Sequence, residues 1–295
     1  SYINRYAVLP TKRVAIFTSS DEGYATAHDI IAAGGSVQAI IDTRSDATIS
    51  APHDIPHFKG AKILRTLGNK QVQGVEIELK DGAIRILDCD GVAMSNGWNP
   101  AVHLTCHQGG RPVWDEKTHA FLPGQLPPGM SVAGAALGHF GLKEALADGF
   151  NLGAANATDL GLRAPIITAP DTDPESLAHT PLWRVKATKG KCFVDFQHDV
   201  TDTDIELANR EGFRSVEHMK RYTTLGMATD QGKTANISGL AILGEASGRT
   251  MAEVGTTIFR PPYTPVSLGA LAGHHVHKNF RPTRLTPSHQ WAEEQ

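Results

Sequence analysis

The chain has 295 residues, and its 28 Lys and Arg nearly balance its 31 Asp and Glu, which leaves a formal net charge of -3 at pH 7. This balance argues against nucleic acid or an anionic membrane as a partner, because both select strongly basic surfaces. The three cysteines are widely spaced and form no CxxC pair, so we expect neither a disulfide framework nor a zinc site. No apolar run of about 18 residues occurs, so we expect a soluble protein in the reducing cytoplasm.

Residues 1–95 are predicted to form an α/β unit. The run RVAIFT predicts a strand at 13–18, the next segment predicts a helix that ends at Gly34 and Gly35, and VQAIIDTR predicts a second strand ending near Asp42. A strand, a helix and a strand followed by an acidic residue predict a Rossmann-type nucleotide-binding unit. Its first turn, TSSDEG, has one glycine and two acidic residues, so we expect the unit's own nucleotide site to be degenerate.

A β-meander is predicted to close this unit, because residues 61–95 alternate apolar and polar side chains around an Asp81-Gly82 turn. Residues 96–162 are predicted to belong to a second, larger module. There the small residues of SVAGAA predict a strand, and a helix is expected to begin at about Phe140. Small side chains at such a turn let backbone N–H groups approach a cofactor, although close helix-strand packing explains them equally well.

Two short helices are predicted in residues 191–250. Thr201 or Asp202 is expected to cap the first helix, which ends at Gly212, and Ser215 is expected to begin the second. Side-chain oxygens at these positions can accept hydrogen bonds from the first N–H groups of a helix, which have no partner within it. The segment is therefore predicted to be a small helical lobe.

The segments on either side of this lobe are rich in proline. Residues 163–190 predict a linker between domains, and residues 251–295 predict a second connector. The second connector contains His274, His275 and His277. Their close spacing in a proline-flanked loop, with no acidic or cysteine partner nearby, favours surface histidines over a metal site.

The stretch GMATDQGKTANISG, at 226–239, contains a Gly-Lys-Thr triplet of the kind that binds phosphate. A P-loop needs four residues between its first glycine and this triplet, whereas five residues separate Gly226 from Gly232. The preceding segment is also polar and helical rather than an apolar strand. The sequence therefore disfavours an ATPase, and the residues alone leave the purpose of this loop open.

Six motifs spread along the chain carry a resemblance to a known family. They are RVAIFT, SNGWNPAVHL, SVAGAALG, CFVDFQHDVT, REGFRSVEHMKRYTTLGMATDQGKT and EVGTTIFRPPYTPV. Together they resemble the alpha subunit of heterotetrameric sarcosine oxidase over nearly the whole chain. The resemblance implies that the chain is the middle portion of a longer alpha subunit, with residues 251–295 leading into a folate-binding domain. It also implies beta, gamma and delta subunits as partners.

The resemblance implies that the larger module, of the glutathione-reductase type, holds NAD as a non-catalytic ligand. By position, Gly134, Ala135, Phe140 and Leu142 are its expected contacts, and backbone amides supply the polar groups. Related flavoenzymes have an acidic residue at the position of Ala135, where it binds the ribityl chain of the flavin. The alanine in this chain therefore suits NAD better than a flavin.

The lobe at 191–250 resembles bacterioferritin-associated ferredoxin, a two-helix module that holds a two-iron cluster through four cysteines. Asp195, Gln197, Asp230 and Ala235 stand at the matching positions, and Cys192 lies three residues too early. Iron–sulfur clusters need thiolate ligands. The lobe is therefore expected to fold without iron.

In sarcosine oxidase an FMN lies between the alpha and beta subunits, and the resemblance turns the former cluster site toward that interface. This gives the open loop an expected role in binding FMN. Lys233 would pair with the phosphate as a point charge, and Thr234 and the backbone N–H groups would donate to it. The complete set of expected FMN contacts is Asp230, Gln231, Gly232, Lys233 and Thr234. A solvated loop cation is the alternative interpretation of Lys233.

The resemblance implies oxidative demethylation of sarcosine to glycine, with formation of hydrogen peroxide and methylenetetrahydrofolate, in a complex that also holds FAD and tetrahydrofolate. This chain has no recognisable set of catalytic residues, so its expected role is to hold NAD and to help form the FMN site. One alternative is a flavin reductase, in which NADH reduces a bound flavin. Others are a subunit of a related opine, proline or secondary-amine dehydrogenase, and a binding module without flavin.

Overall fold

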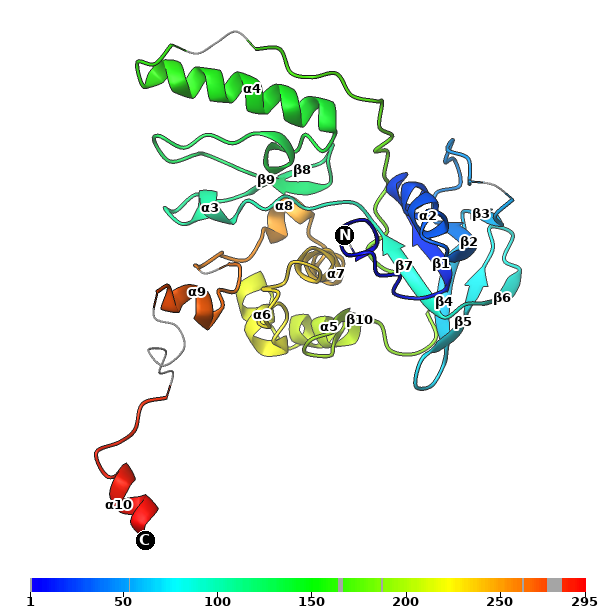
Figure 1. The fold of residues 1–295 in the computed structure, drawn as a ribbon. Coiled ribbons are helices and arrows are strands. Elements are labelled where there is room, and N and C mark those ends of the chain that lie inside the picture. The colour runs from blue at the N-terminus through cyan, green and yellow to red at the C-terminus, as the bar shows by residue number, and fades with distance from the viewer. Residues whose placement is uncertain (1, 53, 164–166, 187, 262, 275–282) are drawn as a thin grey trace.

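The computed structural model describes residues 2–52, 54–163, 167–186, 188–261, 263–274 and 283–295. Figure 1 shows an α/β unit on one side, a helical lobe beside it, and a hairpin with a long helix beyond the lobe. The elements in chain order are α1 (Tyr2–Tyr6), β1 (Arg13–Thr18), α2 (Glu22–Ala32), β2 (Ser36–Asp42), β3 (His57–Lys59), β4 (Lys62–Gly68), β5 (Val72–Glu78), β6 (Ile84–Asp88), β7 (Gly91–Ser95), α3 (His103–Cys106), β8 (Val113–Asp115), β9 (Ala120–Leu122), the 3-10 helix η1 (Gly134–Leu137), α4 (Leu142–Asp159), β10 (Phe193–Asp195), β11 (Val200–Thr201), α5 (Asp202–Arg210), α6 (Val216–Thr223), α7 (Asn236–Ser247), α8 (Met251–Val254), α9 (Leu268–Ala272) and α10 (His289–Glu294).

Four strands form a parallel sheet in the order β3-β2-β1-β7, and α2 packs against one face of it. The predicted strand, helix and strand at the start of the chain are therefore confirmed. Tyr24, Ala27 and Ile30 of α2 face the sheet, because residues three positions apart lie on one side of a helix. The helix ends where predicted: Gly34 has a φ of 82°, and Gly35 N donates to Ile30 O.

The antiparallel sheet β4-β5-β6 covers the opposite face of the parallel sheet. Val75 and Ile77 of this second sheet pack in one cluster with Ala15 and Ile41 of the first. Successive side chains in a strand point to opposite faces, so β1 and β2 contribute to both clusters and the parallel sheet becomes a middle layer. The predicted turn between β5 and β6 is confirmed, since Gly82 has a φ of 83°.

Two predicted strands differ from the structure. The last segment of the predicted meander, β7, pairs in parallel with β1 instead of extending the antiparallel sheet. A backbone bond from Asp90 N to Arg13 O starts this pairing at the open edge of β1. The residues SVAGAA form no strand, because Gly134 and Gly138 adopt φ values of 62° and 93°, outside the β region. They lead instead into the 3-10 helix η1.

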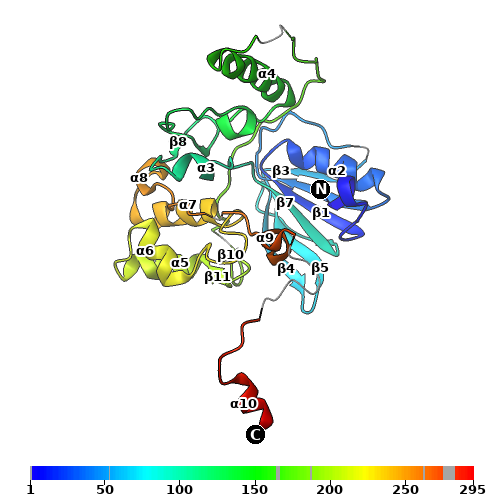
Figure 2. The same cartoon turned by 60° about the vertical axis from the view of Figure 1, so that its left-hand side comes forward.

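The helix expected from about Phe140 is α4, which begins at Leu142 and has 18 residues. Figures 1 and 2 both show it beyond the β8–β9 hairpin, away from the helical lobe. None of its residues is buried within the described part of the chain.

Both predicted helix caps in the lobe are confirmed. Thr201 caps α5 in a capping box with Asp204, and the hydroxyl of Ser215 accepts from His218 N at the start of α6. The helix α5 ends at Arg210, close to the predicted end.

The lobe contains a third helix, α7, that was not predicted. Its sequence NISGLAILGEAS is apolar around most of its circumference, so it lacks the polar face by which an amphipathic helix is recognised. Leu240 and Leu243 are buried in one core with Ile205 of α5, Met219 of α6 and Phe121 of β9. The hairpin β8–β9 is therefore packed against the lobe.

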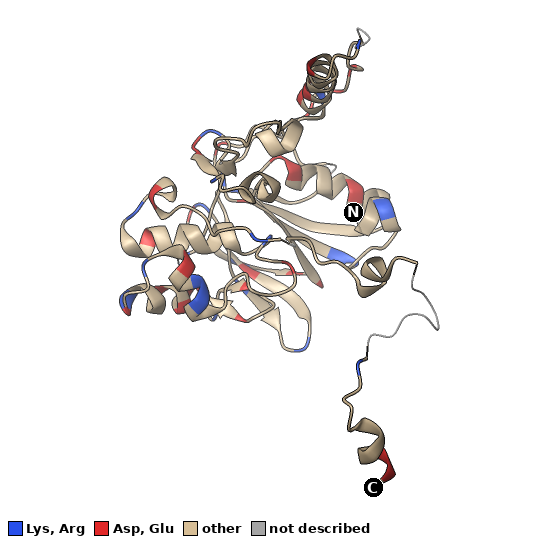
Figure 3. Ribbon diagram, turned by 90° about the vertical axis from the view of Figure 1, so that its left-hand side faces the viewer, with Lys and Arg blue, Asp and Glu red and all other residues tan. Residues whose placement is uncertain are grey.

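The last helices, α9 and α10, have no buried residue among those described, and Figure 2 shows α10 at the far end of an extended segment. His274 is exposed, as predicted, whereas His275 and His277 lie outside the described residues. Figure 3 shows acidic and basic residues interspersed over the ribbon. Among the helices that the structure describes, none combines the length and the apolar character needed to cross a membrane.

Candidate cofactor sites

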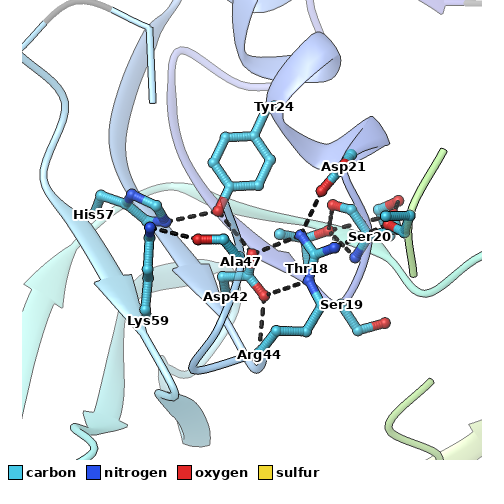
Figure 4. A network of polar contacts seen from close by, with 12 residues as sticks. Thr18, Ser19, Ser20, Asp21, Tyr24, Asp42, Arg44, Ala47, His57 and Lys59 are labelled. Atoms are coloured by element: carbon cyan, nitrogen blue, oxygen red, sulfur yellow. Dashed lines mark hydrogen bonds and ion pairs between the residues drawn. The ribbon is translucent and has the colours of Figure 1, made fainter. Parts of the chain in front are cut away.

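The carboxyl edge of the parallel sheet holds a buried polar network (Figure 4). Asp42, at the end of β2, is fully buried, and its two carboxylate oxygens accept from Arg44 Nε at 3.1 Å and Nη2 at 2.8 Å. Arg44 Nη2 also lies 2.8 Å from Asp21 Oδ1, and both of these side chains are 6% exposed. Burial lowers the pKa of Arg44, but the bonds to Asp42 and Asp21 outweigh it and raise the pKa overall. One guanidinium therefore neutralises two buried carboxylates.

Tyr24 and His57 extend this network. The Tyr24 hydroxyl donates to Asp42 Oδ2 at 2.7 Å, so His57 Nε2 is the donor in its 2.6 Å contact with the same hydroxyl oxygen. Burial, and then Asp42, raise the pKa of Tyr24. Burial, and then Lys59, lower the pKa of His57, which keeps this imidazole neutral near neutral pH.

The expected NAD contacts lie on η1 and at the start of α4. Gly134 N donates to Asp148 Oδ2 at 3.0 Å, and Leu142 N donates to Glu175 Oε2 at 2.6 Å. His139 Nδ1 lies 2.7 Å from the same Asp148 oxygen, and the bonds from His139 and Gly134 lower the pKa of Asp148. Two of the backbone amides expected to face a cofactor thus have carboxylate partners, which the sequence did not indicate.

The expected FMN contacts lie together in the loop before α7. The Asp230 carboxylate accepts from Gly232 N at 3.0 Å, from Thr234 N at 3.4 Å and from Thr234 Oγ1 at 2.9 Å. Burial raises the pKa of Asp230, but these bonds outweigh it and lower the pKa overall. Gln231 has a φ of 55° and donates through Nε2 to Ala228 O. The donors that would bind a phosphate are therefore directed at a carboxylate of the same loop.

Lys233 contacts the connector that follows the lobe. Its ammonium donates to Asp230 O at 3.1 Å and to Tyr263 O at 3.0 Å, and it lies 4.0 Å from the centre of the Tyr263 ring. The imidazole of His103 stacks on the same ring at 4.2 Å. Two groups cannot share one face at this distance, so Tyr263 lies between Lys233 and His103. No sequence pattern predicted this contact, because the three residues belong to distant segments.

The four positions that match cluster cysteines in the ferredoxin resemblance are held by contacts within the protein. Asp195, 3% exposed, accepts from Gln197 N and from Gly226 N, each at 2.9 Å. Ala235 is 1% exposed in the core of the lobe. In the part of the chain that the structure describes, no group of three or more His, Cys, Asp or Glu residues is placed to hold a metal ion.

The two sets of expected contacts do not form one site. In Figures 1 and 2 the β8–β9 hairpin lies between α4, which adjoins the expected NAD contacts, and α7, which follows the expected FMN loop. Each set is nevertheless local: η1 packs against α4, and the loop closes on the first turn of α7 through the bond from Asn236 N to Gly232 O.

Comparison with known proteins identifies relatives along nearly the entire chain. The profile of the Sarcosine oxidase A3 domain matches residues 189–274. The alpha subunit of sarcosine oxidase from Rhizobium meliloti (strain 1021) is 43% identical over 99% of this chain and 30% of that protein. The corresponding alpha subunit from Corynebacterium sp. (strain P-1) is 35% identical over 99% of this chain and 32% of its own length. The chain thus spans about a third of these relatives.

A more distant relative and one solved structure extend the comparison. A subunit of opine oxidase from Rhizobium meliloti (strain 1021) is 24% identical over 92% of this chain and 69% of that protein. The crystal structure of L-proline dehydrogenase from P. horikoshii matches with a TM-score of 0.64 at 19% identity, covering 92% of this chain and 52% of that one. That likeness concerns the fold, and it agrees with the mixed α/β architecture and its parallel sheet. Over almost its whole length the chain is therefore related to the alpha subunit of sarcosine oxidase, the family that its motifs resemble.

Proposed function

We propose that this chain is part of the alpha subunit of a sarcosine oxidase. The observation that carries the proposal is the identity of 43% over 99% of the chain with one such subunit. The whole enzyme would convert sarcosine to glycine with hydrogen peroxide and methylenetetrahydrofolate. FAD and tetrahydrofolate would bind elsewhere in the complex, and beta, gamma and delta subunits would be the partners in the cytoplasm.

Within this enzyme we assign the α/β unit to the Rossmann type and the helical lobe to the ferredoxin type without its cluster. The strand order β3-β2-β1-β7 with the β1-α2-β2 crossover supports the first assignment. The caps of α5 and α6, together with Asp195 and Ala235 at cysteine positions, support the second. Both parts would position cofactors, and amine oxidation would occur on another subunit.

NAD is proposed to bind beside η1 and α4, near Gly134, Ala135, Phe140 and Leu142. Ala135 and Leu142 are exposed, which leaves them accessible to a ligand. The carboxylates of Asp148 and Glu175 already accept from two nearby amides. The polar groups of NAD that suit this place are therefore hydroxyl and amide donors rather than the pyrophosphate.

FMN is proposed to bind at the Asp230–Thr234 loop, with Lys233 directed to its phosphate. Lys233 and Thr234 are exposed, and the partners of the ammonium are two neutral carbonyl groups and an aromatic ring, which a dianion can outcompete. The Asp230 carboxylate would have to turn away, because like charges cannot share these donors. FMN itself would supply the redox chemistry at the subunit interface.

The test is the FMN content of the purified complex that carries Lys233→Ala. We expect less FMN per complex, whereas Lys70→Ala, which removes an exposed lysine between β4 and β5, should leave the content unchanged. Unchanged FMN in the Lys233 variant would reject the loop as the phosphate site, without bearing on membership of the family.

The opine oxidase relationship favours one second candidate, a subunit of an oxidase for another secondary amine. The lower identity of 24%, against 43% for the sarcosine oxidase relative, places it second. Comparing sarcosine with an opine as substrate of the assembled enzyme separates the two candidates.

A further inference from the structure

A segment of the predicted linker, residues 176–182, crosses the carboxyl edge of the parallel sheet; we call it the strap. It bonds through its backbone to the turn after β1. Ala178 O accepts from Asp21 N at 2.9 Å, and Thr180 N donates to Ser19 O at 2.9 Å. His179 forms a β-bridge with Ser20 between these two bonds. The strap is thus held like a short extra strand.

Side chains of the α/β unit also fix the strap. Arg44 Nη1 donates to Ala178 O at 2.9 Å, so one strap carbonyl accepts from both Arg44 and Asp21. Asn96, just after β7, bonds both backbone groups of Leu182, accepting from its N at 3.0 Å and donating to its O at 3.2 Å. The fork of Arg44 therefore joins the strap to the buried carboxylates.

The strap lies where a nucleotide binds in sheets of this kind. Ligands of parallel α/β sheets bind outside the carboxyl ends of the strands, with phosphate at the N-terminus of the first helix and ribose at an acid after the second strand. Here the N–H of Asp21, which precedes α2, points to a strap carbonyl. The acid after the second strand, Asp42, accepts from Arg44 and Tyr24. The groups that would bind phosphate and ribose are both engaged.

We propose that the strap is a built-in plug, which takes the place of a nucleotide and joins the α/β unit to the linker. The proposal rests on the Rossmann-type assignment of that unit. A carbonyl that accepts from Asp21 N and Arg44 reproduces the partners of a phosphate oxygen without its charge, which suits an edge that already contains two carboxylates. The unit would bind no nucleotide at this edge.

A cavity of about 360 Å³ remains beside the strap, lined in part by Thr43, Arg44, Lys62 and Thr180. This volume is near the lower limit for small-molecule sites, which span about 300–1,000 Å³. It would accommodate part of a nucleotide at most while the strap is in place. ADP is therefore the stringent probe, and NAD is the larger one.

The test is amide hydrogen exchange of the intact protein that contains this chain, with and without millimolar ADP or NAD. Thr180→Pro removes the N–H that bonds Ser19 O, and His179 is already extended, as a residue before proline must be. Thr180→Ala keeps that N–H and changes only an exposed side chain, so it is the matched control.

In the parent protein and in Thr180→Ala we expect neither nucleotide to alter exchange at residues 19–24. In Thr180→Pro we expect exchange at Asp21 to be faster by on the order of tenfold, because one strap bond is lost. Asn96→Ala, which loses both bonds to Leu182, should act in the same direction and serves if the proline variant does not fold.

Two results would overturn the plug. Protection of residues 19–24 by ADP or NAD in the parent protein would mean that the strap is a lid over a working nucleotide site. Exchange at Asp21 that is unchanged in both Thr180→Pro and Asn96→Ala would mean that the strap does not hold this edge. Protection by NAD near residues 134–142 would bear on the proposed NAD site alone.

Discussion

The α/β unit and the helical lobe each contain carboxylates whose oxygens accept several hydrogen bonds, but the donors differ. In the α/β unit, Asp21 and Asp42 are buried around the side chain of Arg44. In the lobe, Asp195 and Asp230 accept from backbone N–H groups and a hydroxyl of nearby loops. The first arrangement depends on one long side chain that joins distant segments, whereas the second is made mostly by the local backbone. Losing one partner should therefore cost more in the first.

The largest effect is expected for Arg44→Ala. It leaves Asp21 and Asp42 buried without their counterion, and breaking a buried pair in this way costs about 3–5 kcal/mol. Denaturant unfolding measures the loss in the free energy of unfolding. Arg65→Ala is the control in the same unit, because Arg65 is 46% exposed and shares Glu76 with Lys189; it should cost less than about 1 kcal/mol. Equal costs for the two variants would contradict the importance of burial.

A smaller effect is expected for Asp195→Ala in the lobe. The variant leaves the N–H groups of Gln197 and Gly226 without their acceptor, at a cost of about 1–3 kcal/mol. Asp195→Asn keeps one acceptor oxygen and should recover part of this loss in the same unfolding measurement. If Asp195→Ala destabilised the protein more than Arg44→Ala, the comparison between the two regions would be reversed.

The third prediction concerns pH. Burial lowers the pKa of His57 below its ordinary value of 6.5, so the unfolded chain binds a proton at this residue more readily than the folded one. The stabilisation is thus complete above pH 6.5 and declines as the pH falls through the folded pKa. We expect the parent protein to lose stability relative to His57→Gln over this range, with exposed His28→Gln as the control. Parallel pH profiles for the parent and the His57 variant would argue against a buried neutral imidazole.

Local features of the fold could be read from the sequence. Thr201 and Ser215 were predicted as caps because a cap depends on the few residues that follow it. The strand, helix and strand around Gly34 were predicted for the same reason. Pairing between distant segments could not be read: whether β7 joins β1 or β6 depends on which edge is open once the chain has folded. The small residues around Gly134 fit a strand or a turn, and its positive φ decides for the turn.

The candidate sites were predictable in composition rather than in wiring. The Asp230–Thr234 loop was found through its Gly-Lys-Thr triplet, but its bonds to Asp230 and the contact of Lys233 with Tyr263 depend on folding. The strap had been assigned to a linker because it lies in a proline-rich segment. Its bonds run through the backbone, so no side-chain pattern marks them. A backbone carbonyl such as that of Ala178 leaves no trace in a sequence.

The apolar surface of α7 has a consequence for the order in which the lobe folds. A helix with so little polar surface gains nothing by forming alone in water, and its burial requires Ile205, Met219 and Phe121 to be in place. Phe121 comes from a hairpin far earlier in the chain, so the lobe closes late and all at once. Its helices and the hairpin should consequently melt as a single cooperative unit, however separate they are in sequence.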